Sequence, residues 1–328
     1  MREEHLRYLV CPRCSGDLSI AQLNNVIGDS IENAQLQCSG CGTTYDVIRH
    51  IPRFVPLQNY ASSFGLEWTR HSRTQYDSYS GARVSEERFF KETGWPRQMP
   101  GETILEVGSG SGRFTEQAAS TGAMVVSLDL SYAVEANYSS NGHKDNVLIA
   151  QADIYSMPVR TDFFDRLFCI GVLQHTPDVE RSFLSLPKYL KVGGSLVIDV
   201  YRYFWWQYFL PGYWLREITR RLSPERLYKL CHMYVSLMWP VARLINKLPK
   251  GRYINQLLLI ADYRGVYDLP EKTLKEWAIL DTFDVLSAFH IKPQSIERVR
   301  AWFAKAGMEN AEVHYGYNGI EGHGTRAV

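Results

Sequence analysis

Three glycines at alternate positions follow an acidic residue in the first half of the chain. Glu106 ends a short apolar run, and Gly108, Gly110 and Gly112 come shortly after it. Glycine allows a positive φ and a close approach of a ligand to the backbone, and free N–H groups at a helix start attract carboxylate or phosphate. The pattern predicts a strand, a ligand-binding turn and a helix. It is similar to the dinucleotide fingerprint G-x-G-x-x-G, but its third glycine comes one place early.

A second apolar run, residues 124–129, also ends in a carboxylate. Asp129 closes this run and Leu130 follows it. Open α/β sheets bind ligands at the carboxyl ends of their strands, where a carboxylate accepts hydrogen bonds from both hydroxyls of a ribose. An enzyme that binds NAD would use the same residue, so this run alone does not separate two classes of nucleotide enzyme.

The acidic-x-G-x-G-x-G form resembles motif I of the class I S-adenosylmethionine-dependent methyltransferases, and the segments that follow it come in that family's order. The resemblance implies an α/β fold with a Rossmann-like seven-stranded sheet. It also implies that Glu106 and the three glycines hold the methionine part of S-adenosylmethionine and that Asp129 with Leu130 takes the ribose. Asp153 and Ile154, which follow another apolar run, would take the adenine.

Two residues are candidates for work on the methyl acceptor. His175 follows the fourth predicted strand, and its ordinary pKa suits a general base near neutral pH. Asp199 ends the fifth strand, where we expect it to orient the imidazole of His175 or to contact a hydroxyl. The alternative for His175 is a helix-start residue that only shapes the cofactor pocket. Upstream, Trp68, Gln75 and Tyr76 are expected either to touch the ligands or to pack within an N-terminal cap.

Two Cys-x-x-Cys pairs lie near the N-terminus. Cys11, Cys14, Cys38 and Cys41 supply four thiolates, which satisfy tetrahedral zinc and leave no open position, so a structural Zn²⁺ is predicted. The alternative is four reduced cysteines without metal. This segment resembles the small zinc-ribbon proteins that activate several tRNA and protein methyltransferases.

The pattern divides the chain into four parts. Residues 1–56 form the expected zinc ribbon, and the aromatic segment 57–100 connects it to the core. Residues 101–201 and 291–328 form the expected methyltransferase core. Residues 202–290 are far longer than an ordinary connection and are predicted to be a helical cap over the substrate side.

Positive and negative charges nearly balance over the whole chain, but one segment is strongly basic. The protein has 36 lysines and arginines against 35 acidic residues, which gives no broad basic surface for nucleic acid. Residues 201–252 are rich in aromatic side chains and carry ten lysines and arginines against two glutamates, a net charge of +8. This composition suits contact with a membrane surface, a lipid phosphate or RNA. The alternative is a cap whose aromatic residues form its core and whose cations are solvated.

No signal peptide is predicted for the charged N-terminus, and no run of about 18 apolar residues is present, so a cytoplasmic protein, peripheral to the membrane if the cap binds lipid, is expected. The catalytic half resembles small-molecule methyltransferases related to the quinone-biosynthesis enzymes. The resemblance favours O-methylation of a small or lipid-linked metabolite, with His175 as base. RNA methylation is the alternative, although the Asn/Asp-Pro-Pro-Tyr/Phe motif of amino-directed nucleic-acid methyltransferases is missing after the fourth strand. A non-catalytic, cofactor-binding scaffold is a third reading.

Overall fold

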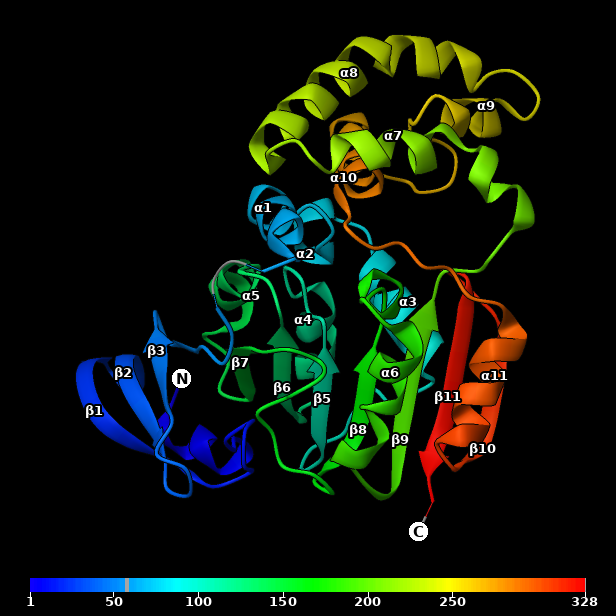
Figure 1. The fold of residues 1–328 in the computed structure, drawn as a ribbon. Coiled ribbons are helices and arrows are strands. Elements are labelled where there is room, and N and C mark those ends of the chain that lie inside the picture. Colours follow the sequence, from blue (N-terminus) through cyan, green and yellow to red (C-terminus); the bar gives the residue numbers. More distant parts are fainter. Residues whose placement is uncertain (57–58, 328) are drawn as a thin grey trace.

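Seven strands form one sheet at the centre of the molecule, in the order β10-β11-β9-β8-β5-β6-β7 (Figure 1). The computed structural model describes residues 1–56 and 59–327. The strands are β5 (Thr103–Val107), β6 (Met124–Asp129), β7 (Val147–Gln151), β8 (Phe164–Cys169), β9 (Leu190–Val200), β10 (Met308–Tyr315) and β11 (Ile320–Arg326). Strands β5 to β9 pair in parallel, whereas β11 pairs antiparallel with β9 and β10. The predicted α/β fold with a Rossmann-like seven-stranded sheet is confirmed.

Helices cover both faces of the sheet, so its parallel strands are mostly buried and rich in apolar residues. All five residues of β7 are buried, as are four of the five in β5. One face packs against α3 (Val84–Thr93), α4 (Arg113–Ser120) and α5 (Val134–Asn141). The other packs against α6 (Val179–Leu184) and α11 (Ile296–Lys305). Short 3₁₀ turns, η2 (Leu173–His175) and η3 (Pro187–Tyr189), follow β8 and precede β9.

A separate four-stranded antiparallel sheet forms the N-terminal part. After the turn η1 (Glu3–Tyr8) come β1 (Leu18–Ile27), β2 (Ser30–Cys38), β3 (Thr44–Ile48) and β4 (Ile51–Pro52). This sheet lies beside β7, the edge strand of the large sheet (Figure 1). The Phe54 N–H donates to the Gln151 carbonyl at 2.9 Å, and the Arg53 guanidinium contacts both the Gln151 amide oxygen and the Glu135 carboxylate. The two sheets are therefore joined by backbone and side-chain bonds.

Three helices precede the core: α1 (Ser62–Arg70), α2 (Asp77–Ser80) and α3. The buried Tyr76 hydroxyl donates to the Ser111 carbonyl at 2.6 Å, and the Trp277 indole N–H donates to the Thr74 carbonyl at 2.9 Å. This segment therefore links the glycine turn to the helices above it.

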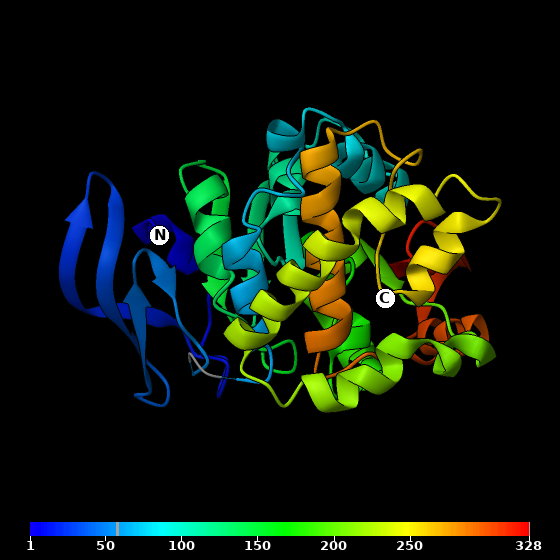
Figure 2. The same cartoon turned by 90° about the horizontal axis from the view of Figure 1, so that it is seen from above.

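The segment between β9 and α11 is helical, as predicted. It holds η4 (Trp205–Phe209), α7 (Pro211–Thr219), α8 (Pro224–Ile245), α9 (Gly251–Leu257) and α10 (Glu271–Ser287). These helices lie beyond the carboxyl ends of the strands, with α10 running below α7 and α8 (Figures 1 and 2). We call them the cap. Among the described residues, no helix is long and apolar enough to cross a membrane.

Candidate functional site

The glycine turn between β5 and α4 has the backbone that its sequence predicted. Gly108, Gly110 and Gly112 have φ of +84°, +54° and +92°, in the left-handed region that favours glycine. A Cβ on Gly108 would lie 2.3 Å from Val172, and one on Gly112 would lie 2.1 Å from the Asn137 amide oxygen. Both the conformation and the close packing therefore require glycine.

A cavity of about 920 Å³ begins at this turn and extends up to the cap. It lies at the carboxyl ends of the parallel strands, where open α/β sheets bind ligands. The predicted cofactor residues that line it are Gly108, Gly110, Asp129, Leu130 and Ile154. Trp68 and Gln75 also line it, whereas Tyr76 supports the turn from below.

Asp129 is held in place by the glycine turn itself. One of its carboxylate oxygens accepts from the Gly110 N–H at 2.8 Å, and the other accepts from the Ser131 N–H and hydroxyl, both at 2.7 Å. Burial raises the pKa of this carboxyl, and these hydrogen bonds act in the opposite direction. The carboxylate is fixed at the cavity wall, where it can accept further hydrogen bonds from ribose hydroxyls.

Three of the predicted cofactor residues do not line the cavity. Glu106 is fully buried and accepts hydrogen bonds from Thr115 at 2.5 Å and Ser127 at 2.7 Å. Burial raises its pKa to about 7. Asp153 accepts from the Tyr155 N–H at 3.0 Å, and Gly112 ends the glycine turn as the N-cap of α4. Their direct contact with a cofactor stays a prediction.

His175 lines the cavity at the end of η2. Its Nδ1 lies 3.0 Å from the His290 carbonyl oxygen, which can only accept, so Nδ1 carries the proton and Nε2 keeps its lone pair. The ring packs edge-on against Phe64 and Tyr201. Burial lowers the pKa of His175 to about 4, below the near-neutral value expected from the sequence, so the imidazole is neutral at physiological pH but is a weaker base than predicted.

Asp199, the second predicted acceptor-side residue, has different partners. It is fully buried, accepts from the Gly171 N–H and forms an ion pair of 2.7 Å with Arg88. Arg88 also pairs with Glu92 at 2.7 Å. The structure therefore brings Asp199 next to Arg88 rather than next to the His175 ring, and its role toward the acceptor stays a prediction.

Sequence reasoning did not select three carboxylates that line the cavity: Glu67 of α1 and Asp281 and Asp284 of α10. Burial raises the pKa of each aspartate to about 7 and that of Glu67 well above its usual range. The sequence did contain a signal that could have identified Asp281 and Asp284, because these two aspartates interrupt the apolar run 279–286.

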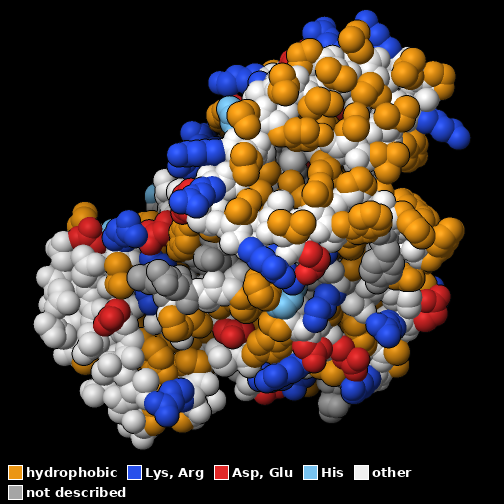
Figure 3. All heavy atoms as spheres, turned by 45° about the horizontal axis from the view of Figure 1, so that its top comes forward, with side chains coloured by type: hydrophobic (Ala, Val, Ile, Leu, Met, Phe, Trp, Pro, Cys, Tyr) orange, Lys and Arg blue, Asp and Glu red, His pale blue; other side chains and the backbone are white. Residues whose placement is uncertain are grey.

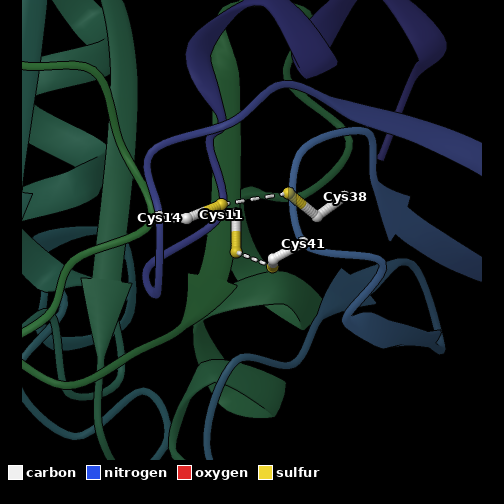
Figure 4. Close-up of side chains that lie close together, drawn as sticks. All are labelled: Cys11, Cys14, Cys38 and Cys41. Atoms are coloured by element: carbon white, nitrogen blue, oxygen red, sulfur yellow. Dashed lines mark hydrogen bonds between the residues drawn. The ribbon is translucent and has the colours of Figure 1, made fainter.

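The four predicted metal-ligating cysteines converge from the loop before β1, from the end of β2 and from the turn that follows it (Figure 4). Their sulfur atoms all lie within 4.8 Å of one another, with 3.7 Å between Cys11 and Cys41 and 3.4 Å between Cys14 and Cys38. Tetrahedral zinc with Zn–S bonds of about 2.3 Å requires S···S distances of about 3.8 Å. The donor set and its spacing fit a zinc ion, and these cysteines do not line the cavity.

The part of the chain that forms the glycine turn and the neighbouring strands is similar to known proteins. Residues 105–198 match the family model of a methyltransferase domain. The chain contains a methyltransferase domain. This domain holds the glycine turn together with Asp129, Ile154 and His175.

Several relatives match parts of the chain, and three of them illustrate the range. Phosphoethanolamine N-methyltransferase of Triticum aestivum is 34% identical over 29% of this chain and 20% of the relative. Demethylmenaquinone methyltransferase of Thermobifida fusca is 30% identical over 30% of this chain and 43% of the relative. The tRNA U34 carboxymethyltransferase of Ruthia magnifica subsp. Calyptogena magnifica is 26% identical over 56% of this chain and 48% of the relative. The chain thus spans less than half of the length of each of these relatives.

Proposed function

We propose that the methyltransferase domain transfers a methyl group from S-adenosylmethionine to a hydroxyl of a small or lipid-linked metabolite. The observation that supports this proposal is one continuous cavity that runs from the glycine turn past His175 to the cap. Two of the three relatives are named for small acceptors and the third is named for tRNA. RNA therefore stays the alternative acceptor.

When bound, S-adenosylmethionine supplies a methyl group that already carries its leaving group. In our proposal the glycine turn and Asp129 hold the adenosyl cofactor, with Leu130 and Ile154 beside it. His175 then accepts, at Nε2, the proton that the acceptor hydroxyl loses on methylation. The His290 carbonyl keeps the proton on Nδ1 and so keeps Nε2 available.

Enzyme turnover on two acceptor pools tests this proposal. Release of S-adenosylhomocysteine would be measured with total RNA and with an extract of lipids and small metabolites, using wild type, His175→Ala and His143→Ala. His143 is exposed and does not line the cavity, so it is the matched control. We expect turnover only with the extract, lost in His175→Ala and kept in His143→Ala. Turnover on RNA alone would replace the proposed acceptor class.

We also propose that the cysteine cluster holds a structural zinc ion. Four sulfur donors leave no coordination position for a substrate, which supports a role in folding rather than in the reaction. The ion would close the N-terminal sheet that lies against β7.

We further propose that the cap contacts the surface of an anionic membrane. The outward side of α8 presents large apolar side chains at helical spacing: Leu230, Met233, Leu237, Val241 and Leu244. Leu237 is 74% exposed, although the opposite side of the helix is already buried against α10. Hydrophobic side chains gather over the cap in the space-filling view (Figure 3). An apolar patch of this kind on a protein surface is typical of an interaction site.

Further exposed apolar side chains lie on η4 and α7. Trp205, Phe209 and Ile218 are each at least two-thirds exposed, and the exposed Trp206 also lines the cavity. An acceptor held in a bilayer would therefore meet the apolar surface and the cavity next to each other.

Positive charge lies along the same helices. Arg226, Lys229, Arg243 and Lys247 of the α8 region are exposed, and the net charge of residues 201–252 is +8. Exposed apolar and basic side chains on one amphipathic element favour the surface of an anionic bilayer. This charge distribution supports anionic lipid, rather than a protein, as the partner.

A further inference from the structure

Three acidic side chains face one another across the upper part of the cavity. Glu67 comes from α1, and Asp281 and Asp284 come from α10, which packs against α1. On α10 they follow Trp277 by four and seven residues, so all three lie on the side of the helix that faces the cavity. The fold thus places the carboxylates of two distant segments in one site.

These carboxylates have few partners within the part of the chain that the structure describes. Asp281 accepts from the Tyr263 hydroxyl at 2.5 Å. By contrast, Oε2 of Glu67 and Oδ1 of Asp284 are buried and accept no hydrogen bond from any described residue. Glu67 is only 1% exposed. A buried carboxylate without a partner is costly, so each of these groups requires a proton or a cation.

An amide oxygen in the same cavity is also left without a donor. Gln75 is 8% exposed and lines the cavity, and its Oε1 accepts no hydrogen bond from the described residues. The bond from Trp277 to the Thr74 carbonyl places Gln75 beside α10. This observation is independent of the acids and indicates a ligand that brings hydrogen-bond donors.

Aromatic rings complete the walls of this region: Tyr201, Tyr263, Tyr267 and Trp277 line the cavity together with the acids. Rings of this kind attract a cation through their faces. Five arginines also line the cavity: Arg88, Arg113, Arg202, Arg216 and Arg252. Arg216 acts on Asp284 and Arg113 acts on Asp281, but neither forms an ion pair with that aspartate among the described residues. Nη1 of Arg216 is also buried without an acceptor there, so the site leaves the acidic acceptors and one cationic donor for a ligand.

We propose that the methyl acceptor carries a basic nitrogen, which Glu67, Asp281 and Asp284 bind as an ammonium group. This inference rests on the proposed function, because it assumes that the acceptor occupies this cavity. The ammonium is the group by which the acceptor is recognised, and the methylated hydroxyl lies at His175. An amino alcohol or an amino sugar, free or linked to a lipid, has both groups.

Binding of a matched pair of probes tests the inference. Cyclohexylamine, which is protonated at pH 7.5, and the neutral cyclohexanol would be titrated by calorimetry into the protein saturated with S-adenosylhomocysteine. We expect the amine to bind at least about tenfold more tightly than the alcohol, a difference of about 1.4 kcal/mol. In Asp281→Asn/Asp284→Asn the two probes should bind alike. The control Asp268→Asn changes an exposed aspartate of the cap and should bind as wild type does.

Circular dichroism would confirm that each variant is folded, and the single variant Glu67→Gln, which keeps the side-chain volume, should weaken amine binding in the same direction. Equal binding of the two probes to wild type, or binding of neither, would overturn the inference. So would a double variant that still prefers the amine. If the double variant loses S-adenosylhomocysteine as well, the acids serve the cofactor, and the inference fails while the proposed function stands. If wild type does not bind S-adenosylhomocysteine, the proposed function fails, and the amine titration of the free protein still tests the acidic site.

Discussion

The Nδ1 atom of His175 lies 3.0 Å from the carbonyl oxygen of His290 and so joins the end of β8 to the end of the cap. The two residues are 115 positions apart in the chain. This bond selects one tautomer of the imidazole and leaves the other ring nitrogen at the cavity. One hydrogen bond therefore links the position of the cap to the tautomer of His175.

Replacement of His175 by alanine should lower kcat by about 10²- to 10⁴-fold, the usual contribution of a general base. Binding of S-adenosylhomocysteine, measured by calorimetry, should change little because the glycine turn and Asp129 are untouched. His143→Ala should keep wild-type kcat. A variant with wild-type kcat and altered cofactor binding would instead make His175 a residue of the cofactor pocket.

The low pKa of His175 predicts a pH dependence of stability. Burial lowers the folded-state pKa to about 4, below the unfolded value of about 6.5. Between these two values the unfolded state binds more protons, so the free energy of unfolding should fall as pH falls from about 6.5 to 4. His175→Gln should show a weaker fall over this range in urea unfolding. If the pH dependence of the free energy of unfolding is the same in this variant, a group other than His175 takes up the proton.

Asp281 and Asp284 in the cap predict the opposite pH dependence, a stability that falls as pH rises. Burial raises the pKa of Asp281 and Asp284 to about 7, so the folded protein without a ligand holds protons that the unfolded chain has lost. Their contribution to stability is present below about pH 4 and is lost as pH rises through about 7. Relative to wild type, Asp281→Asn/Asp284→Asn should therefore gain stability between pH 5 and 8. Thermal unfolding by circular dichroism measures this difference, and Asp268→Asn should not show it.

Arg88 should matter for folding more than an arginine at the surface. Its guanidinium is buried between Asp199 and Glu92, and Arg88→Met would leave two buried carboxylates without their cation. We expect a loss of about 3–5 kcal/mol in the free energy of unfolding. Arg97→Met, which removes a half-exposed arginine paired with Glu86, should cost no more than about 1 kcal/mol. Denaturation in urea compares the two, and equal losses would contradict the assigned role.

Zinc content can be measured directly on the purified protein. Atomic absorption should find one zinc ion per chain, and Cys14→Ser should lose it together with much of the stability of residues 1–56. Cys231→Ala, which changes a buried cysteine of the cap, should keep the ion. A zinc-free wild type that folds normally would support the alternative of four reduced thiols.

Flotation with vesicles tests the surface of the cap. Wild type should float with vesicles that contain phosphatidylglycerol and much less with phosphatidylcholine alone, and high salt should weaken binding. Met233→Glu/Leu237→Glu should abolish flotation. Leu23→Glu, which changes an exposed leucine of the N-terminal sheet, should float as wild type does. Absence of wild type from the anionic vesicles at low salt would rule out the membrane contact.

The sequence predicted those site residues whose structural signal lies within one short stretch of the chain. Gly108 and Asp129 could be placed from sequence because a strand, a turn and a strand-end carboxylate are signals that lie within about ten residues. Glu67 and Asp284 could not be paired in this way. Their helices, α1 and α10, contact each other although they come from distant parts of the chain, so only tertiary packing makes the two carboxylates one site. The Arg88–Asp199 ion pair, across 111 residues, escaped prediction for the same reason.

The attachment of the N-terminal sheet to β7 also affects solubility. A strand at the border of a sheet offers unpaired N–H and C=O groups to any other extended chain, which promotes aggregation. Here Phe54 bonds to the Gln151 carbonyl and Arg53 covers the Gln151 side chain, so part of that border is already occupied. The N-terminal sheet thus covers part of the exposed edge of β7, and we expect a chain without residues 1–56 to aggregate more readily.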